Sequence, residues 1–374
     1  MSKPTLSFYT NIPTPYQLDF FKELAKLFHL KVIYYSKTES NRSWHLPNPD
    51  DYEVIFLKDT AIARIIQKWI IDFHFSWQII RIAFTDKSDF IIVGGAYWMP
   101  NASLALIAGK LKRKKVAYFS EPLYEVKNWL KYGMKWIVLR VVNTCCHSLF
   151  CVGKKAAKSF ENYHVTVPKF IIPYNINSSI YKSLDKVKLE GYIKKYKSNN
   201  EVIILTSGAL IERKGMDILV KAIKSIKNES LRLIIIGDGP MKKELKAMSG
   251  SDNRVVLAGQ QQPEETPYFF AIADMFALAS RYDGWAVVVN EAIAANLPIV
   301  SSDKVGAAVD LIASQELGVL CESENVFQFA REIGDLAKNT DRRNSIKKNA
   351  EKLIPIISSQ YNAQLVFDIF TTKV

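Results

Sequence analysis

The feature of this chain that most constrains its fold is a regular alternation of short, mostly uncharged, β-rich runs with helical segments. The first half contains LSFYT (6–10), KVIYYS (31–36), DFIIVGG (89–95) and KKVAYFS (114–120). The second half contains EVIILTSG (201–208), LRLIIIGDG (231–239), RVVLAG (254–259), MFALAS (275–280) and LPIVSSD (297–303). Such strands between amphipathic helices favour a parallel sheet, because each crossover covers one face with a helix. The sequence therefore predicts two doubly wound α/β halves.

The halves are expected to divide where proline and asparagine interrupt this pattern, in IIPYNINSS (171–179). A chain of 374 residues is long for a single core and suits two domains of about 100 to 200 residues each. We therefore expect an N-terminal domain over 1–173 and a C-terminal domain over 174–356. Ligands of open α/β sheets bind beyond the carboxyl ends of the strands, so a cleft between the halves is the expected site.

The net charge of +13 is concentrated in the first half. Residues 1–173 carry 24 Lys and Arg against 13 Asp and Glu, together with six of the seven tryptophans. Basic residues beside aromatic side chains suit anionic membrane headgroups, and no RRM, KH or helix-turn-helix signature favours nucleic acid. We expect an anionic membrane surface, and no nucleic acid, as a partner. A basic nucleic-acid-binding protein or a membrane scaffold is the alternative.

The four cysteines lack zinc-site spacing, so buried free thiols in a reducing compartment are expected for Cys145, Cys146, Cys151 and Cys321. The sequence has no stretch that is typical of a signal peptide and no run of about 18 apolar residues. These features predict a cytoplasmic protein, bound peripherally to the cytoplasmic face of the membrane by its basic half. The chain also lacks a D-x-D sequence, and we expect no bound metal.

Two stretches of the basic half predict amphipathic helices. In 61–84 an apolar face is formed by Ile62, Ile65, Ile66, Trp69, Ile70 and Phe73, and Arg64 and Lys68 share another face. In 126–142 a lysine stripe lies beside two tryptophans one heptad apart, at Lys127, Lys131, Lys135, Trp129 and Trp136. Two interpretations stay open: the apolar faces pack on the sheet while the lysines are solvated, or they insert shallowly into a membrane.

Two glycine-containing turns predict an anion site in the second half. Gly208 follows a strand, and Arg213 and Lys214 precede the next helix. A glycine lets the backbone approach an anion, a helix N-terminus favours negative charge, and the two cations can donate charge-assisted hydrogen bonds. Gly237, in the turn GDGP, lies at the same end of the same sheet. A diphosphate fits this arrangement, although the first turn alone is also typical of a solvated loop and the second of a tight connection.

The stretch RYDGWAVVVNEAIAAN (281–296) places two carboxylates eight positions apart, Asp283 on a loop and Glu291 near a helix start. The intervening amides are expected to donate freely to phosphate oxygens; they belong to Gly284, Trp285, Ala286 and Val287. Carboxylates beside this group can accept hydrogen bonds from vicinal hydroxyls. The pattern therefore indicates that Asp283 holds a sugar and Glu291 a ribose.

Three motifs in order, S-G-x-L-x-x-R-K-G-x-D-x-L, I-G-D-G-P, and an acid followed after seven residues by E-A-x-A-x-x-x-P-I-V, resemble the donor half of family 4 retaining glycosyltransferases. The resemblance is strong over about 200–315, and N-I-P-T-P-Y-Q (11–17) resembles that family's first strand-loop-helix. The rest of the N-terminal half is similar in pattern alone. The resemblance implies the GT-B fold, two Rossmann-like domains facing a cleft, with a last helix at about 357–374 returning to the N-terminal domain.

The resemblance also implies roles for individual residues. Arg213 and Lys214 neutralise the leaving diphosphate, and Glu291 binds the ribose. The remaining donor contacts hold the transferred sugar or border the phosphates; they come from Asp283, the amides of Trp285 and Ala286, and Gly208. The sequence departs from the family at four positions, which bear on donor identity: Asp283 replaces a glutamate, Asn296 a glycine, and Ala307 and Ala308 stand where glycines are frequent.

A larger departure follows the strand KKVAYFS, where many relatives have a histidine and this chain has Ser120 and Glu121. Glu121 is a candidate general base for the acceptor hydroxyl or a group that orients the donor sugar; a surface or helix-capping glutamate is the alternative. Further acceptor-side candidates are Tyr16, Gly95, Tyr97 and Trp98, for which packing under a loop is equally compatible with the sequence.

Taken with the resemblance, these features predict a metal-independent, retaining transfer of a sugar from a nucleoside diphosphate sugar to a hydroxyl of a saccharide acceptor. A UDP-sugar is expected before a GDP-sugar, as co-substrate and without a further cofactor. The basic half favours a lipid-linked acceptor, in surface polysaccharide or glycan biosynthesis. A sugar-nucleotide epimerase or hydrolase of the same fold is the alternative, and the sequence does not indicate the oligomeric state.

Overall fold

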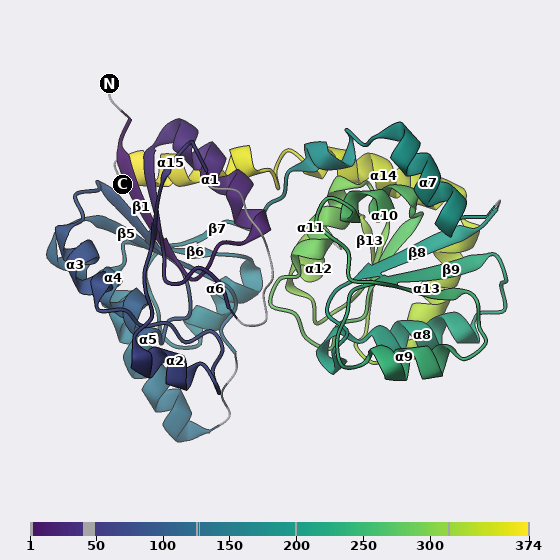
Figure 1. The fold of residues 1–374 in the computed structure, drawn as a ribbon, viewed down its shortest axis with the longest axis horizontal. Coiled ribbons are helices and arrows are strands. Elements are labelled where there is room, and N and C mark those ends of the chain that lie inside the picture. Colours follow the sequence, from purple (N-terminus) through teal and green to yellow (C-terminus); the bar gives the residue numbers. More distant parts are fainter. Residues whose placement is uncertain are drawn as a thin grey trace. The chain divides into compact units, whose positions relative to one another are not determined.

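The computed structural model describes residues 3–39, 49–124, 126, 128–198, 200–312 and 315–372. The chain divides into two compact units (Figure 1). Unit 1 consists of Met1–Asn175 and Ser359–Val374, and unit 2 of Ile176–Ser358. Unit 2 is therefore inserted, along the sequence, between the main body of unit 1 and its last helix.

Unit 1 is built on a parallel sheet whose described strands have the order β3-β2-β1-β4-β5-β6-β7. These strands are β1 (Thr5–Thr10), β2 (His29–Tyr34), β3 (Glu53–Phe56), β4 (Phe90–Val93), β5 (Lys115–Ser120), β6 (Ser148–Cys151) and β7 (Lys169–Ile171). The helices are α1 (Pro15–Leu27), α2 (Ala61–Ile66), α3 (Gln78–Thr85), α4 (Pro100–Leu111), α5 (Trp129–Cys145), α6 (Lys154–Glu161) and α15 (Ser359–Thr371). The strand order reverses between β1 and β4, which defines a topological switch point.

The two faces of this sheet are covered by different helices. On one face Tyr9 and Tyr118 belong to a buried cluster with side chains of α3, α4, α5 and α6. On the other face α15 lies beside α1 (Figure 1), and the ring of Phe370 stacks on Phe90 with centroids 4.8 Å apart. Successive strand residues alternate between these faces, so the strand interiors are mostly apolar.

Unit 2 repeats the plan with the strand order β10-β9-β8-β11-β12-β13. The strands are β8 (Val202–Ser207), β9 (Leu231–Ile236), β10 (Val255–Gly259), β11 (Met275–Leu278), β12 (Ile299–Ser302) and β13 (Gly318–Cys321). The helices are η1 (Ser178–Tyr181), α7 (Lys186–Tyr196), η2 (Glu212–Lys214), α8 (Met216–Ser225), α9 (Lys242–Ser249), α10 (Thr266–Ile272), α11 (Val287–Ala294), α12 (Gly306–Leu311), α13 (Val326–Lys338) and α14 (Thr340–Leu353). The switch point of this sheet lies between β8 and β11.

Both sheets are parallel throughout the described strands, which confirms the predicted doubly wound α/β class. The core of unit 2 again has two sides. Ile204 of β8 and Phe329 of α13 are fully buried on one side. On the other side Phe270 of α10 stacks on Phe276 of β11, with ring centroids 5.6 Å apart.

The prediction of one amphipathic helix over 61–84 is wrong. The segment forms α2 and α3, separated by an irregular stretch in which His74 is buried. The Asp59 carboxylate lies 2.9 Å from Nδ1 of His74 and accepts hydrogen bonds from Gln67 and the amide of Phe75. A continuous helix would carry residue 74 roughly 20 Å along its axis from residue 61, away from Asp59. Burial lowers the pKa of His74, but Asp59 and Glu39 outweigh this effect and raise the pKa to about 9.

The predicted lysine stripe of 126–142 is also corrected. Lys135 is only 4% exposed: its Nζ lies 4.6 Å from the ring centre of Tyr163 and donates to the carbonyl of Tyr124. Desolvation lowers the pKa of Lys135 to about 8. Of the other two lysines, Lys131 is exposed and Lys127 lies outside the described residues.

The apolar face predicted for 61–84 does not pack on the sheet as one interpretation required. Ile62, Ile65 and Trp69 are 67%, 54% and 78% exposed. On α5, Trp129 is 78% exposed, whereas Trp136 packs against the unit 1 core. Trp44, another tryptophan of the basic half, falls outside the described residues.

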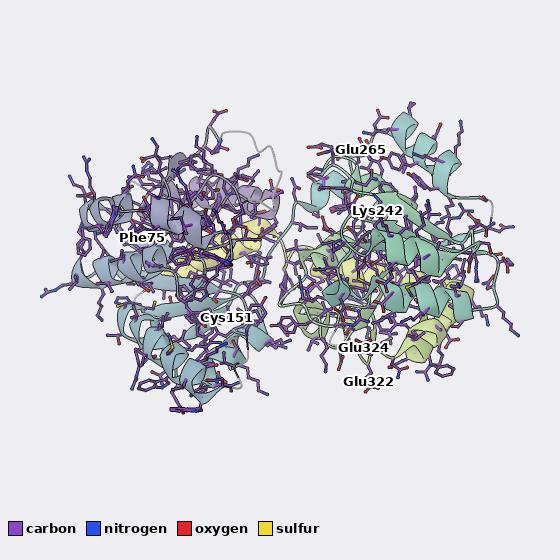
Figure 2. The ribbon with its side chains drawn as sticks, turned by 60° about the horizontal axis from the view of Figure 1, so that its bottom comes forward. Phe75, Cys151, Lys242, Glu265, Glu322 and Glu324 are labelled. Carbon is purple, nitrogen blue, oxygen red and sulfur yellow. The ribbon has the colours of Figure 1, made fainter. Side chains whose placement is uncertain are left out.

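The four cysteines are buried and free, as predicted from their spacing. Cys151 is labelled in Figure 2. Burial raises the pKa of its thiol to about 12, so the thiol stays protonated at neutral pH and is a poor nucleophile. Among the described residues, none of the helices has both the length and the apolar character needed to span a membrane.

We predict that Phe370→Ala destabilises unit 1 by about 3–5 kcal/mol, because it removes a buried ring from between α15 and the sheet. Urea unfolding followed by tryptophan fluorescence measures this effect, since six of the seven tryptophans belong to residues 1–173. Phe327→Ala, which truncates a 77% exposed ring on α13, is the matched control. It should change stability by less than about 0.5 kcal/mol. Equal unfolding midpoints for the two variants would contradict the packing of α15 on unit 1.

Candidate active site

The loops after β8 and β9 are in backbone contact at the carboxyl edge of unit 2. The amide of Gly208 donates to the carbonyl of Ile236 at 3.0 Å, and the amide of Leu210 donates to the backbone carbonyl of Asp238 at 2.9 Å. A Cβ atom on Gly237 would lie 1.9 Å from the carbonyl oxygen of Gly208, and Gly237 has a φ of +139°. Only glycine allows both the conformation and the approach. The two predicted glycine turns are therefore adjacent.

The loops after β8 and β11 meet across the switch point and bring opposite charges together. Nζ of Lys214 lies 2.5 Å from Oδ2 of Asp283, and Nη1 of Arg213 lies 3.7 Å from the same oxygen. Arg213 also donates to the carbonyl of Tyr282 at 2.8 Å. Side chains that the sequence separates by about 70 positions thus form one charged group. Lys214 and Asp283 are mostly buried, whereas Arg213 is 44% exposed.

Arg281 fixes the relative position of these two loops. Its amide donates to the carbonyl of Arg213 at 2.8 Å, and its guanidinium forms a bidentate pair with Asp217 at 2.8 and 2.9 Å. The same guanidinium pairs with Glu324, which is labelled in Figure 2. Burial raises the pKa of Asp217, but the hydrogen bond and charge of Arg281 outweigh it and lower the pKa below its ordinary value.

The loop after β11 is joined in turn to the loop after β12. The amide of Gly306 donates to the carbonyl of Asp283 at 3.1 Å, and the amide of Ala307 donates to the carbonyl of Trp285 at 2.9 Å. A Cβ on Gly306 would lie 2.1 Å from the carbonyl oxygen of Gly284. The close approach therefore requires Gly306, and Ala307 is accommodated beside it.

The turn that precedes α11 is strained. Ala286, its N-cap residue, has φ 72° and ψ 82°, a conformation that costs a non-glycine residue about 1–3 kcal/mol. The buried indole of Trp285 donates to Oδ1 of Asn290 at 2.9 Å and fixes this turn on the helix. Within the described residues, the amides of Trp285 and Ala286 have no hydrogen-bond acceptor. Strain of this kind is characteristic of functional sites, and these two amides are available to an anion. At the other end of α11, Asn296 takes a φ of 57°, as the glycine it replaces would.

Glu291 lies on the second turn of α11. Its Oε1 accepts a hydrogen bond from the hydroxyl of Tyr181 at 3.2 Å. Desolvation raises the pKa of Glu291 to about 7, and the Tyr181 hydrogen bond opposes this shift. The carboxyl therefore changes its ionisation near neutral pH, which makes its capacity to accept hydrogen bonds sensitive to pH.

In unit 1 the carboxyl edge carries a second group of predicted residues. Glu121 follows β5 and is exposed, and its Oε1 accepts a hydrogen bond from Tyr174 at 2.9 Å. The ring of Tyr174 packs on Tyr16 of α1, with centroids 4.9 Å apart. The structure thus brings Tyr16 and Glu121 together through Tyr174.

The other acceptor-side candidates have packing contacts within unit 1. Gly95 has a φ of +98°, and a Cβ there would lie 2.3 Å from Oδ1 of Asn11, in the loop after β1. Tyr97 lies against the ammonium group of Lys135, and Trp98 stacks on Phe73 with centroids 6.0 Å apart. Tyr97 and Trp98 are therefore packed within the unit and are not grouped with Glu121.

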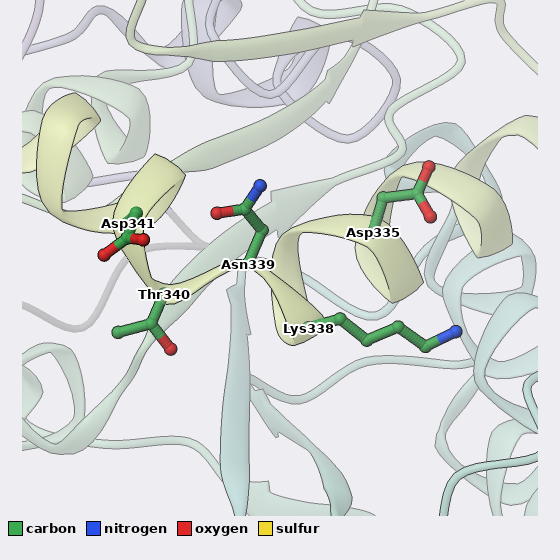
Figure 3. A pocket seen from close by; sticks show the side chains of 5 residues that line it. All are labelled: Asp335, Lys338, Asn339, Thr340 and Asp341. Carbon is green, nitrogen blue, oxygen red and sulfur yellow. The ribbon is translucent and has the colours of Figure 1, made fainter.

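A cavity of about 550 Å³ lies elsewhere in unit 2, between the end of α13 and the start of α14 (Figure 3). Its lining residues are Asp335, Lys338, Asn339, Thr340 and Asp341. Because α13 runs back from the carboxyl edge after β13, its last residues lie at the amino edge of the sheet. The two aspartates also disfavour a diphosphate. This cavity is therefore separate from the residues described above.

Most of the predicted donor residues come together in unit 2, from Gly208 and Gly237 to Asp283 and the amides before α11. Val287 begins α11, and Glu291 lies one turn further along it. Sequence reasoning missed Tyr181, Arg281 and Gly306, which hold this arrangement, and Tyr174, which holds Glu121 in unit 1. Of these, Arg281 and Gly306 flank recognised motifs, whereas no sequence signal connects Tyr181 with Glu291.

Residues 190–353 match the family model of the glycosyl transferases group 1. This part of unit 2 is a glycosyl transferases group 1 domain. A GDP-mannose-dependent alpha-(1-6)-phosphatidylinositol monomannoside mannosyltransferase of Mycobacterium tuberculosis is 27% identical over 161 residues, 40% of this chain and 42% of the relative. An N-acetylgalactosamine-N,N'-diacetylbacillosaminyl-diphospho-undecaprenol 4-alpha-N-acetylgalactosaminyltransferase of Campylobacter jejuni is 26% identical over 198 residues, 51% of this chain and 50% of the relative. The chain spans half or less of the length of these curated relatives.

Similarity in structure extends over both units. HepE of Anabaena, solved in complex with UDP, superposes with a TM-score of 0.77 over 98% of this chain and 99% of its own, at 15% identity. Together with the two parallel doubly wound sheets, this likeness shows the GT-B fold. The resemblance of the sequence motifs implied the same fold.

We predict that Gly237→Ala destabilises unit 2 by about 2 kcal/mol or more, because the added methyl group clashes with Gly208 and the φ is unfavourable for alanine. Differential scanning calorimetry should show a fall of roughly 4–8 °C in one transition. Gly334→Ala on α13 is the control, since a Cβ there meets nothing within 4 Å. It should be neutral or stabilising by up to about 1 kcal/mol. A Gly237→Ala protein as stable as the control would contradict the described contact between the loops.

Proposed function

We propose that the chain is a retaining glycosyltransferase, which moves a sugar from a nucleoside diphosphate sugar to a hydroxyl of a saccharide acceptor. One observation supports this most directly: Lys214 and Asp283 are in contact at the switch point of unit 2, beside the strained turn at Ala286. The position is the one where open α/β sheets bind nucleotides. Membership of residues 190–353 in the glycosyl transferases group 1 supports the same reaction.

The arrangement can stabilise the charge that develops during transfer. When the bond between the sugar C1 and the diphosphate oxygen breaks, negative charge grows on the leaving group. Lys214, Arg213 and the amides of Trp285 and Ala286 are the donors that can neutralise it. Preorganised donors of this kind each contribute about 10²- to 10³-fold to the rate. Asp283, which already accepts from Lys214, has a second oxygen for sugar hydroxyls, and Glu291 can accept from the ribose.

In this proposal no metal is needed, because Lys214 and Arg213 supply the positive charge that a divalent ion would otherwise provide. The acceptor side is assigned to unit 1, where Glu121 is held by Tyr174. Glu121 then takes the acceptor proton or orients the transferred sugar. We propose a UDP-sugar as the first donor to test and a GDP-sugar as the second. HepE was solved with UDP, and the mycobacterial relative is GDP-mannose-dependent.

We predict that UDP or GDP raises the melting temperature of the protein by mass action and that Lys214→Ala weakens this binding about 10- to 100-fold. A hydrogen bond to a charged group contributes about 1.5–3 kcal/mol, which corresponds to this range. Thermal shift and calorimetric titration with UDP, GDP, ADP and their glucose and mannose derivatives measure it. Lys242→Ala, which breaks a similar but exposed Lys–Asp pair in the same unit, should bind normally; Lys242 is labelled in Figure 2.

Unchanged affinity of Lys214→Ala for every nucleotide would sink the site assignment. Product analysis with the binding donor then separates the reactions. Transfer should require an acceptor, retain the anomeric configuration and survive EDTA. Formation of an epimer or of free sugar without an acceptor would instead favour an epimerase or hydrolase.

We further propose a lipid-linked acceptor, in surface polysaccharide or glycan biosynthesis at the cytoplasmic face of a membrane. Unit 1 supports this with exposed apolar side chains on α2, α3 and α5 and in the segment between α2 and α3. They include Ile62, Ile65, Trp69, Trp77, Ile80, Trp129, Leu130, Met134 and Ile137. The layer of α3, α4 and α5 is continuous, because α4 packs against both neighbours. Exposed basic residues belong to the same segments: Arg64 lies on α2, Lys68 just after it, and Lys131 on α5. These segments can therefore combine insertion of apolar side chains with attraction to anionic headgroups.

We predict that the protein sediments with vesicles containing phosphatidylglycerol at low salt and that Trp69→Glu with Trp129→Glu weakens this binding about tenfold or more. Phe327→Glu is the control, because this ring is equally exposed but lies in unit 2. Neutral phosphatidylcholine vesicles should bind less, since they lack the anionic charge. Equal binding of the double variant and the control would refute the unit 1 surface as the contact.

A further inference from the structure

The hydroxyl of Tyr181 is the hydrogen-bond partner of Glu291 among the described residues. Tyr181 ends η1, 110 positions before Glu291, shortly after the chain enters unit 2. Its ring packs edge-on against Phe270, with centroids 5.6 Å apart. Phe270 stacks on Phe276 of β11, the strand whose loop carries Asp283. The position of the hydroxyl is therefore fixed relative to the donor loops.

The contact with Tyr181 gives the two oxygens of the Glu291 carboxylate different surroundings. Oε1 accepts from Tyr181, which leaves Oε2 as the oxygen without a protein donor in the described structure. A carboxylate that is to accept from ribose hydroxyls must be ionised and held in one rotamer. Glu291 is partly buried, and desolvation alone disfavours its ionisation. A neutral phenol that donates to the charged form favours ionisation without adding a charge.

We propose that Tyr181 is a positioning residue for nucleotide recognition: its hydroxyl holds the Glu291 carboxylate in the ionised, correctly rotated state in which Oε2 accepts the ribose hydroxyls. The inference rests on the proposed function, which assigns the ribose to Glu291. It adds a residue and a pH dependence that the family motifs do not contain.

Other charged groups near Glu291 do not replace Tyr181. The helices α12 and α14 also pack on α11. Their charged residues are Asp310 on α12 and Asp341, Arg342, Arg343, Lys347, Lys348, Glu351 and Lys352 on α14. Within the described chain, the hydrogen bond that Glu291 forms is with Tyr181 and with none of these residues. The pKa of Glu291, about 7, reflects burial and the opposing hydrogen bond from Tyr181.

The test is the pH dependence of UDP and GDP binding by calorimetric titration between pH 5.5 and 8.5. Wild-type affinity should fall as the pH drops through about 7, because a protonated Glu291 accepts fewer hydrogen bonds. In Tyr181→Phe the midpoint should move upward by about 0.5–1 pH unit, since a donor to the charged form is lost. At pH 8.5 its affinity should approach that of the wild type. Glu291→Gln should retain only the pH dependence of the ligand phosphate, which titrates near pH 6 and is common to all variants.

Tyr192→Phe is the matched control, because it removes a hydrogen bond from another tyrosine of unit 2 to another glutamate, Glu265, labelled in Figure 2. Its midpoint should equal that of the wild type. Weakening of Tyr181→Phe by the same factor at every pH would reveal a merely structural role and overturn the inference, as would an unshifted midpoint. If Tyr181→Phe does not fold, full wild-type pH dependence in Glu291→Gln would overturn it. Failure of wild-type protein to bind either nucleotide would overturn the proposed function as well.

Discussion

The pairing of Lys214 with Asp283 depends on the hydrogen-bonded loops at the carboxyl edge of unit 2 more than on the two side chains themselves. A mostly buried ion pair gains little unless its geometry is good, because both charges lose hydration. Here the loops after β9, β8, β11 and β12 are joined by main-chain hydrogen bonds in the order of the strands that precede them. The backbone therefore places the charges in advance, and a ligand need not organise them.

The sequence predicted the class of fold because the strongest strands are apolar on both faces, as in EVIILTSG and LRLIIIGDG. Four strands were not predicted: β3, β6, β7 and β13. β3, β7 and β13 lie at sheet edges, are only three or four residues long and are partly exposed, so their composition carries little signal. β6 lies inside the sheet, but SLFC follows the cysteine-containing end of α5 too closely to be separated from it by composition.

The candidate site was predictable where chemistry and local geometry coincide, as at Lys214, Asp283 and Gly237. It was not predictable where a contact joins distant segments, as between Tyr181 and Glu291. The same limit explains the errors in unit 1. Helical periodicity over 61–84 was outweighed by burial of His74 beside Asp59, and the regular lysine spacing gave no indication that Lys135 lies between aromatic rings. Buried polar partners, which periodicity does not register, decided both cases.

The late position of α15 in the sequence bears on the order in which the protein matures on the ribosome. Every residue of unit 2 precedes α15, whereas unit 1 needs α15 to cover Phe28 and Phe90 beside α1. During translation unit 2 can therefore complete its core first, while the first part of unit 1 still exposes an aromatic surface to solvent. Nascent chains at this stage present a binding surface for chaperones, and release of α15 from the ribosomal tunnel ends that exposure.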